Sequence, residues 1–230
     1  MAVVVSQAAG CIITSGGEEY ATITANWSLK QEATGQTLAC PPGITTATIY
    51  SQPVDTAFQP VGRAILDLHD CNDNAGRTDP LPPDVYQVWI ELTNGSGGTV
   101  YARSLSAFVD VIDVDKTFST TILNDGGYFQ FDWNLVDAAT NAPMRCSDEP
   151  AIANIVAASM SSTTNFVDTR FPCSDGTGIT KGMVAGNYTV EFRAEDSAAR
   201  PLSPAPTVRT GTILDLNRVT DLGSITVRVN

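Results

Sequence analysis

The sequence predicts an all-β protein made of two tandem antiparallel β-sandwich modules, each closed by one internal disulfide. Three observations predict this. The two halves of the 230-residue chain repeat each other, short segments of alternating apolar and polar residues follow one another between turn residues, and four of the five cysteines fall two to each half. Ser, Thr, Val, Gly and Pro are plentiful, and no segment has the spacing of an amphipathic helix.

The repeat consists of two blocks at slightly different offsets. Trp27, Leu29, Ala33, Thr34, Cys40, Ala47 and Ile49 return 106 positions later, without a gap, as Trp133, Leu135, Ala139, Thr140, Cys146, Ala153 and Ile155. Cys71, Tyr86 and Val88 return 102 positions later as Cys173, Tyr188 and Val190. A period of about 100 residues is that of a duplicated globular domain and is too long for a solenoid repeat. We therefore expect module one at residues 20–123 and module two at 124–230.

The expected strands come in the same order in both modules. In the first strand of each, apolar and polar residues alternate, so that Trp27 and Trp133 point into a core. A turn, the first cysteine and a second strand follow, then a strand led by Tyr86 or Tyr188, and finally a Thr- and Val-rich strand. The expected strands are 23–29, 47–50, 86–92 and 117–123 in module one, and 129–135, 153–156, 188–192 and 224–229 in module two.

The boundary between the modules is expected at Asp125-Gly126-Gly127. So short a connection predicts modules held end to end with limited freedom.

The cysteines are expected to pair within each module. Four cysteines allow three connectivities, and we choose Cys40–Cys71 and Cys146–Cys173 because each copy must be able to fold alone. Closing loops of this size stabilises a fold by roughly 3–4 kcal/mol per bridge. Paired cysteines also indicate an oxidising compartment, where disulfides form and persist. Zinc is disfavoured, since the chain has no C-x-x-C pair and a single histidine, His69.

The fifth cysteine, Cys11, follows Ala8-Ala9-Gly10, a string that resembles the lipobox of bacterial lipoproteins. The resemblance implies that Cys11 carries the lipid that anchors the protein in the bacterial cell envelope, in the outer membrane or periplasm, and that residues 1–19 are a truncated signal followed by a flexible tether. The upstream segment departs from the pattern, because it has no Lys or Arg and only a short apolar run from Ala2 to Val5. The alternative is an unpaired thiol in the tail of a secreted protein.

The G-x-Y-x-V run from Gly186 to Val190 resembles the penultimate strand of immunoglobulin-like and transthyretin-like modules of secreted bacterial proteins. Trp27 precedes both cysteines of its module, unlike the tryptophan of true immunoglobulin domains, so the resemblance implies only an immunoglobulin-like sandwich. The whole pattern W-x-L…C…C…G-x-Y-x-V behind a lipobox resembles uncharacterised lipoproteins of myxobacteria and related deltaproteobacteria. That resemblance implies a location and no chemistry.

Charge and composition narrow the functional classes. The net charge of −12 repels phosphate backbones, which argues against a nucleic-acid partner. A catalytic triad could be built only around His69, no G-x-S-x-G elbow occurs, and His69 is expected to be an ordinary surface imidazole. We therefore expect no enzyme and no cofactor.

Two features are candidates for a site. Asp70, Asn72 and Asn74 place oxygen ligands at alternate positions, as in a calcium loop, but Gly76 comes one residue late and no closing Glu follows, so a plain turn-rich loop is the alternative. Trp89 has the opposite phase from Tyr86, Val88 and Ile90, which predicts partial exposure and a ligand or interface contact.

These features lead to three functional hypotheses. The first is a non-catalytic envelope lipoprotein that binds an unknown envelope protein or glycan, or acts as a spacer. The second is a carbohydrate-binding or adhesive surface module, and the third is an accessory domain of a hydrolase.

Overall fold

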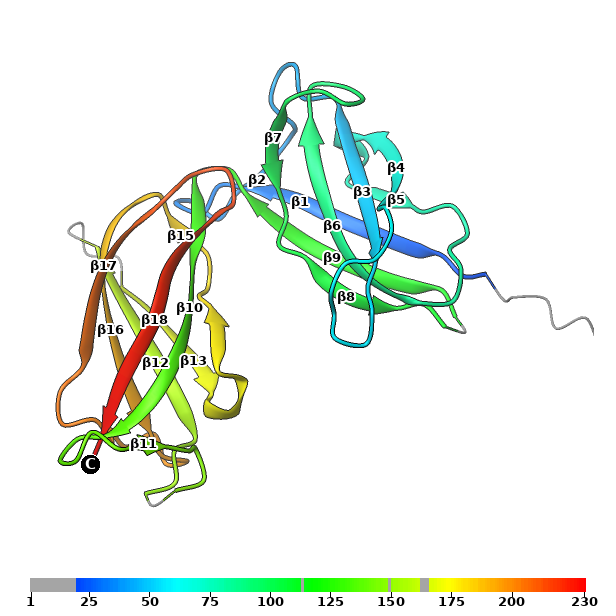
Figure 1. Cartoon of the computed structure of the whole chain (residues 1–230). Helices are drawn as coiled ribbons and strands as arrows, with labels where there is room; N and C mark the ends of the chain where they lie inside the picture. Colours follow the sequence, from blue (N-terminus) through cyan, green and yellow to red (C-terminus); the bar gives the residue numbers. More distant parts are fainter. Residues whose placement is uncertain (1–19, 113, 149, 162–165) are drawn as a thin grey trace, which may run out of the picture.

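The computed structural model describes residues 20–112, 114–148, 150–161 and 166–230. These residues form two tandem immunoglobulin-like β-sandwich modules, as the sequence predicts. Figure 1 shows the modules as two lobes placed end to end, with the start of β1 and the C-terminus at opposite ends of the molecule. Cys11 and the expected tether lie outside the described residues.

Module one consists of two packed sheets. Its strands are β1 (Ile23–Lys30), β2 (Thr37–Leu38), β3 (Thr46–Pro53), β4 (Ile65–Asp70), β5 (Ala75–Arg77), β6 (Val85–Thr93), β7 (Val100–Arg103), β8 (Ala107–Asp110) and β9 (Lys116–Leu123). In the first sheet β1 lies between β9 and the short strands β2 and β5; the second sheet has the order β4-β3-β6, with β7 and β8 following one another along the outer edge of β6.

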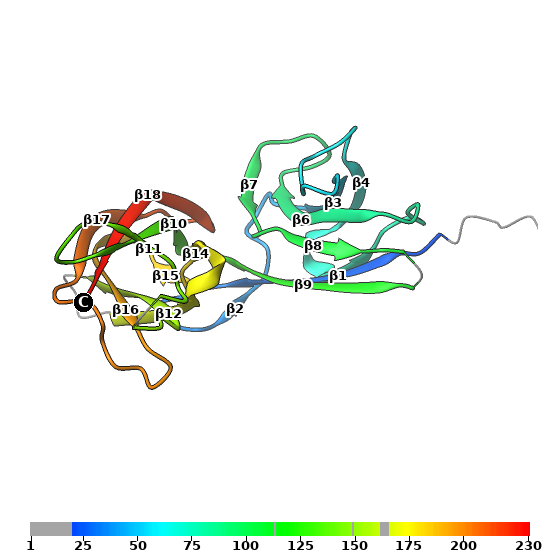
Figure 2. The same cartoon turned by 60° about the horizontal axis from the view of Figure 1, so that its bottom comes forward.

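Module two repeats this arrangement. Its strands are β10 (Gly126–Asp137), β11 (Pro143–Met144), β12 (Asn154–Ser161), β13 (Phe166–Pro172), β14 (Thr177–Ile179), β15 (Met183–Val184), β16 (Gly186–Glu195), β17 (Thr207–Ile213) and β18 (Arg218–Val229). One sheet places β10 between β18 and the short strands β11, β14 and β15, and the other has the order β13-β12-β16-β17. Figure 2 shows the two layers of strands in each lobe. Among the described residues the only helical segments are the 3₁₀ turns η1 (Cys71–Asp73) and η2 (Cys173–Asp175).

One strand pair in each module is parallel, within a sandwich that is otherwise antiparallel as the sequence predicts. The first and last strands of each module, β1 with β9 and β10 with β18, are parallel neighbours, whereas the other pairs are antiparallel. Alternation of apolar and polar residues determines which side chains face the core but carries no information about strand direction, so the sequence pattern could not show this.

The inward faces of the two sheets make one core per module. Trp27 and Trp133 are buried in equivalent positions, and their indole Nε1–H groups donate to the carbonyls of Cys71 (3.0 Å) and Cys173 (3.3 Å). The Tyr86 hydroxyl donates to the Pro82 carbonyl four residues upstream, a tyrosine corner of the kind found in immunoglobulin-like domains; Tyr188 makes the same bond to Val184.

The strand register shows that the second strands align differently from the ungapped repeat. Cys71 N donates to the Thr45 carbonyl and Cys173 N donates to the Ala153 carbonyl, so Ala153 corresponds to Thr45 rather than to Ala47. Module two therefore has two extra residues between Cys146 and β12. Because a shift of two keeps every side chain on the same face of a strand, the incorrect alignment still placed the core correctly.

The modules are joined by Asn124 and Asp125 alone, and the junction is hydrogen-bonded from both sides. Asn217 of module two is buried with φ 62°, and its side chain accepts from Leu123 N (2.7 Å) and donates to the Arg103 carbonyl (2.8 Å). The Asp125 carboxylate accepts from the backbone N–H groups of Glu32 and Ala33. These bonds fix the orientation of module two on module one.

We expect Asn217→Ala to loosen this junction. The change leaves the Leu123 N–H and the Arg103 carbonyl without their partner, which should cost about 1–3 kcal/mol of unfolding free energy. Small-angle X-ray scattering should show a broader distribution of intermodule distances. Asn217→Gly should have the same effect, because glycine adopts the positive φ without strain but also lacks the side-chain amide. An unchanged scattering profile for both variants would show that the amide does not hold the junction.

Candidate binding face

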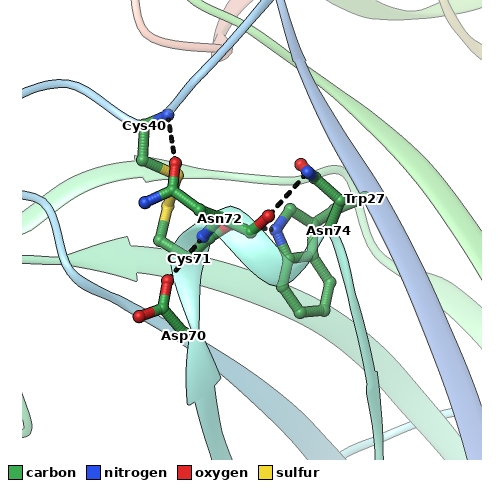
Figure 3. Close-up of a disulfide and its surroundings, with 6 residues drawn as sticks. All are labelled: Trp27, Cys40, Asp70, Cys71, Asn72 and Asn74. Atoms are coloured by element: carbon green, nitrogen blue, oxygen red, sulfur yellow. Dashed lines mark hydrogen bonds between the residues drawn. A yellow bond between two sulfur atoms is a disulfide. The ribbon is translucent and has the colours of Figure 1, made fainter.

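The predicted calcium candidates are used as structural residues of the disulfide loop in module one. The Asp70 carboxylate accepts from Asn72 N (2.8 Å) and caps η1, and the Asn72 side chain accepts from Cys40 N (3.1 Å). Asn74 has φ 57°, and its carbonyl accepts from Trp27 N (3.0 Å). Figure 3 shows these bonds around the Cys40–Cys71 disulfide. The Asn72 side chain thus holds the loop to the cystine, and the backbone carbonyl of Asn74 holds it to β1.

Module two builds the same loop with other side chains, which supports the structural interpretation. Its disulfide joins Cys146 to Cys173, Pro172 stands where Asp70 caps η1, and Gly176 takes the left-handed position of Asn74. The Gly176 carbonyl accepts from Trp133 N (3.1 Å), as that of Asn74 does from Trp27. In the part of the chain that the structure describes, no three His, Cys, Asp or Glu side chains are grouped as metal ligands.

His69 is not the ordinary surface imidazole that the sequence suggested. It is half-buried on β4, opposite Ala47, at the position that core Phe171 occupies in module two. Its ring packs against Gly76, where a Cβ would lie 2.4 Å from the ring, and lies 6.4 Å from the ring of Trp27. His69 therefore serves as a packing residue.

Trp89 lies on the outer face of the five-stranded sheet of module one, as its phase predicts, but it is only 9% exposed. The Tyr50 ring stacks on one face of the indole at 4.9 Å, and the Arg103 guanidinium lies 4.3 Å from its centroid. Glu91 accepts from the indole Nε1 (3.2 Å). The expectation of partial exposure is corrected, because neighbours on β3 and β7 cover the ring.

The hydroxyl of Tyr50 is part of the same cluster. Burial, and secondarily the Glu91 carboxylate to which the hydroxyl is hydrogen-bonded, raise the pKa of Tyr50 above its ordinary value, and Arg103 opposes this shift. The cluster is thus a fixed, tightly bonded support rather than an open aromatic surface.

Exposed apolar side chains surround this cluster. Leu66 lies opposite Tyr50 on β4, and Leu66 and Leu68 are each 49% exposed. At the other end of the sheet, Phe108 on β8 contacts Phe58 of the β3–β4 loop, with ring centroids 4.8 Å apart; they are 51% and 54% exposed. We call Leu66, Leu68, Phe58 and Phe108, with the central Tyr50 and Trp89, the apolar platform.

The equivalent face of module two is charged instead. Asp168, Arg170 and Glu191 stand where Leu66, Leu68 and Trp89 stand in module one, as the strand register shows. Glu195, which is almost completely buried, accepts from Arg170 Nε (3.2 Å) and from Arg193 Nε (3.1 Å). Since the same sandwich folds with an ion-pair network at this place, the fold does not require the apolar platform.

Phe58 gives a second comparison. It has φ 58° in a turn where the Asp55 carboxylate accepts from Ala57 N and Gln59 N. The same turn occurs after β16, where Asp196 accepts from two backbone N–H groups and Ala199 takes the left-handed position with φ 59°. An exposed phenylalanine is thus unnecessary for this turn, and a bulky residue at positive φ is uncommon.

A groove between the modules adjoins the platform at Arg103. It has a volume of about 710 Å³ and is lined by residues 100–106 of module one and by Gln130, Ile179 and residues 216–219 of module two. Sequence reasoning did not find this groove or the platform, because both are assembled from strands far apart in the chain. In the ranges that the structure describes, no helix is long and apolar enough to cross a bilayer.

Comparison with known proteins identifies no family: no protein-family model and no curated protein matches the sequence. Similar solved structures include a leucine-rich repeat protein from Bacteroides thetaiotaomicron (12% identity, 91% of this chain, TM-score 0.39), of which this chain spans only 26%. Others are the minor pilin GBS52 of Streptococcus agalactiae (12%, 91% of this chain and 96% of that chain, 0.32) and the shaft pilin SpaA of Lactobacillus rhamnosus GG (12%, 92% and 98%, 0.28). At these identities and scores the similarities carry no information about function.

Proposed function

We propose that this protein is a non-catalytic binding protein of the bacterial cell envelope, in which module one binds the partner through the apolar platform and module two acts as a spacer. The observation that carries this proposal is the contrast between the duplicated modules. They share one fold, yet Leu66, Leu68 and Trp89 of module one replace charged residues of module two. Large exposed apolar patches on soluble domains mark interaction sites.

The envelope location rests on the two disulfides, which form and persist in oxidising compartments. Acylation of Cys11 belongs to the same proposal. Because the junction fixes module two on module one, module two would hold the platform in one orientation relative to the rest of the protein. Binding of a glycan is the second candidate, because aromatic side chains contribute to the platform.

The test exchanges platform residues for their module-two counterparts. The double variant Leu66→Asp and Leu68→Arg should fold normally, since module two carries Asp168 and Arg170 at the same register and exposed substitutions change stability by about 0.5 kcal/mol or less. Binding of the labelled protein to cells of the source organism that lack their own copy should weaken by about 10-fold or more, the effect of replacing two apolar contacts of an interface by charges.

The matched control is Val208→Asp, which places a charge on an exposed apolar residue of the same outer face in module two. It should bind as the parent does. If the exchange variant keeps full binding, or if Val208→Asp reduces binding equally, the platform is not the binding face.

A further inference from the structure

We infer that the platform takes a polypeptide partner whose apolar side chains are flanked by Lys or Arg. This inference rests on the proposed function and specifies its partner. Two properties of the face point to this partner: which apolar surfaces are open, and which charges surround them.

The open apolar surface comes from leucine and phenylalanine side chains rather than from the faces of the Trp89 indole. Sugars bind proteins by stacking on an open aromatic face. The indole of Trp89 has one face on Tyr50 and the other under Arg103, and the Tyr50 ring gives one of its own faces to that stack. The exposed area comes instead from Leu66 and Leu68, and from two phenylalanines tilted 50° against each other. Phenylalanine is enriched in the buried core of protein interfaces, where apolar side chains of the partner pack against it.

The charges on the same face are mainly acidic. Asp70 on β4, Glu91 on β6 and Asp110 on β8 lie on the outer face by strand register, with Arg103 the cation beside Glu91. The whole chain has a net charge of −12. An acidic ligand would meet repulsion both locally and at long range, whereas a basic segment would be attracted and oriented by the field.

In the experiment, a phage library of short random peptides is first depleted of peptides that bind the Leu66→Asp, Leu68→Arg variant. Peptides that bind the intact parent protein are then selected. Enriched peptides should combine aromatic or aliphatic residues with Lys or Arg. The dissociation constant of the best synthetic peptide, measured by fluorescence anisotropy, should rise about 10-fold or more with the exchange variant and with Phe58→Ala, and not with Val208→Asp. Phe58→Ala should leave the thermal midpoint close to the parent's, because Ala199 takes the same left-handed position in a turn of the same kind after β16.

The basic part of the inference has a separate test. Asp110→Lys should weaken the peptide several-fold, and raising the salt from about 50 mM to about 500 mM should weaken it as well, since partly exposed charge attraction is screened. Enriched peptides that are acidic, or an affinity insensitive to both changes, would overturn the basic partner. A different outcome is that a glycan array binds the parent but not the exchange variant, while no selected peptide distinguishes the two proteins. That result would overturn the polypeptide inference and leave the platform as the binding face. Failure of both would overturn the proposed function too.

Discussion

Replacing Trp133 by alanine is expected to lower the free energy of unfolding of module two by about 3–5 kcal/mol, the usual effect of removing a large buried aromatic side chain. The ring of Trp133 lies 5.9 Å from that of Phe131 and 6.0 Å from that of Phe171, and its indole N–H holds the Cys173 carbonyl. Urea unfolding gives the total change, and hydrogen exchange by mass spectrometry assigns the loss of protection to residues 124–230.

Trp133→Phe is the matched control. It keeps an aromatic ring in the core but leaves the Cys173 carbonyl without its donor, so it should cost less, about 1–3 kcal/mol. The equivalent pair of changes at Trp27 should affect module one in the same order. Equal losses for Phe and Ala would show that the hydrogen bond, and not packing, dominates.

Removal of the disulfide in module two, by Cys146→Ala with Cys173→Ala, is expected to lower the unfolding free energy by roughly 3–4 kcal/mol. The bridge closes a loop across a sequence separation of 27 residues and restricts the unfolded chain. In module one the separation is 31 residues, so removing Cys40–Cys71 should have a similar effect. Urea unfolding of each variant measures the change.

The parent under reducing conditions provides the comparison for both disulfide variants. Under those conditions it should approach the stability of a variant lacking both bridges. Mass mapping of a non-reduced digest should show the two linked peptide pairs. Stability unaffected by either removal, or a linked peptide that joins the two modules, would contradict the pairing.

The two largest effects are expected to be coupled. Each tryptophan donates to the carbonyl of the second cysteine of its own module, so the indole and the disulfide hold the same loop. Residues that share a partner usually show non-additive losses. A variant lacking both Trp133 and the Cys146–Cys173 bridge should therefore lose less than the sum of the separate losses.

Some features of this protein follow from the sequence alone. Repetition of Trp27 as Trp133 and of the cysteine pairs predicts two copies of one sandwich, and a period of two residues along each strand determines which side chains enter the core. The pairing of Cys40 with Cys71 follows from the need of each copy to fold alone. These predictions succeed because they depend on local periodicity and on the repeat, which are both written along the chain.

The tertiary structure decided the rest, because it depends on which strands become neighbours. The parallel pairing of β1 with β9 joins the two ends of a module, and the two-residue insertion before β12 is invisible to a pattern of period two. Trp89 has the outward phase that its sequence predicts, yet Tyr50 and Arg103 cover it from other strands. The apolar platform and the Asn217 contact likewise bring together residues far apart in sequence, the first through the register of the folded sheets and the second through the docking of one module on the other.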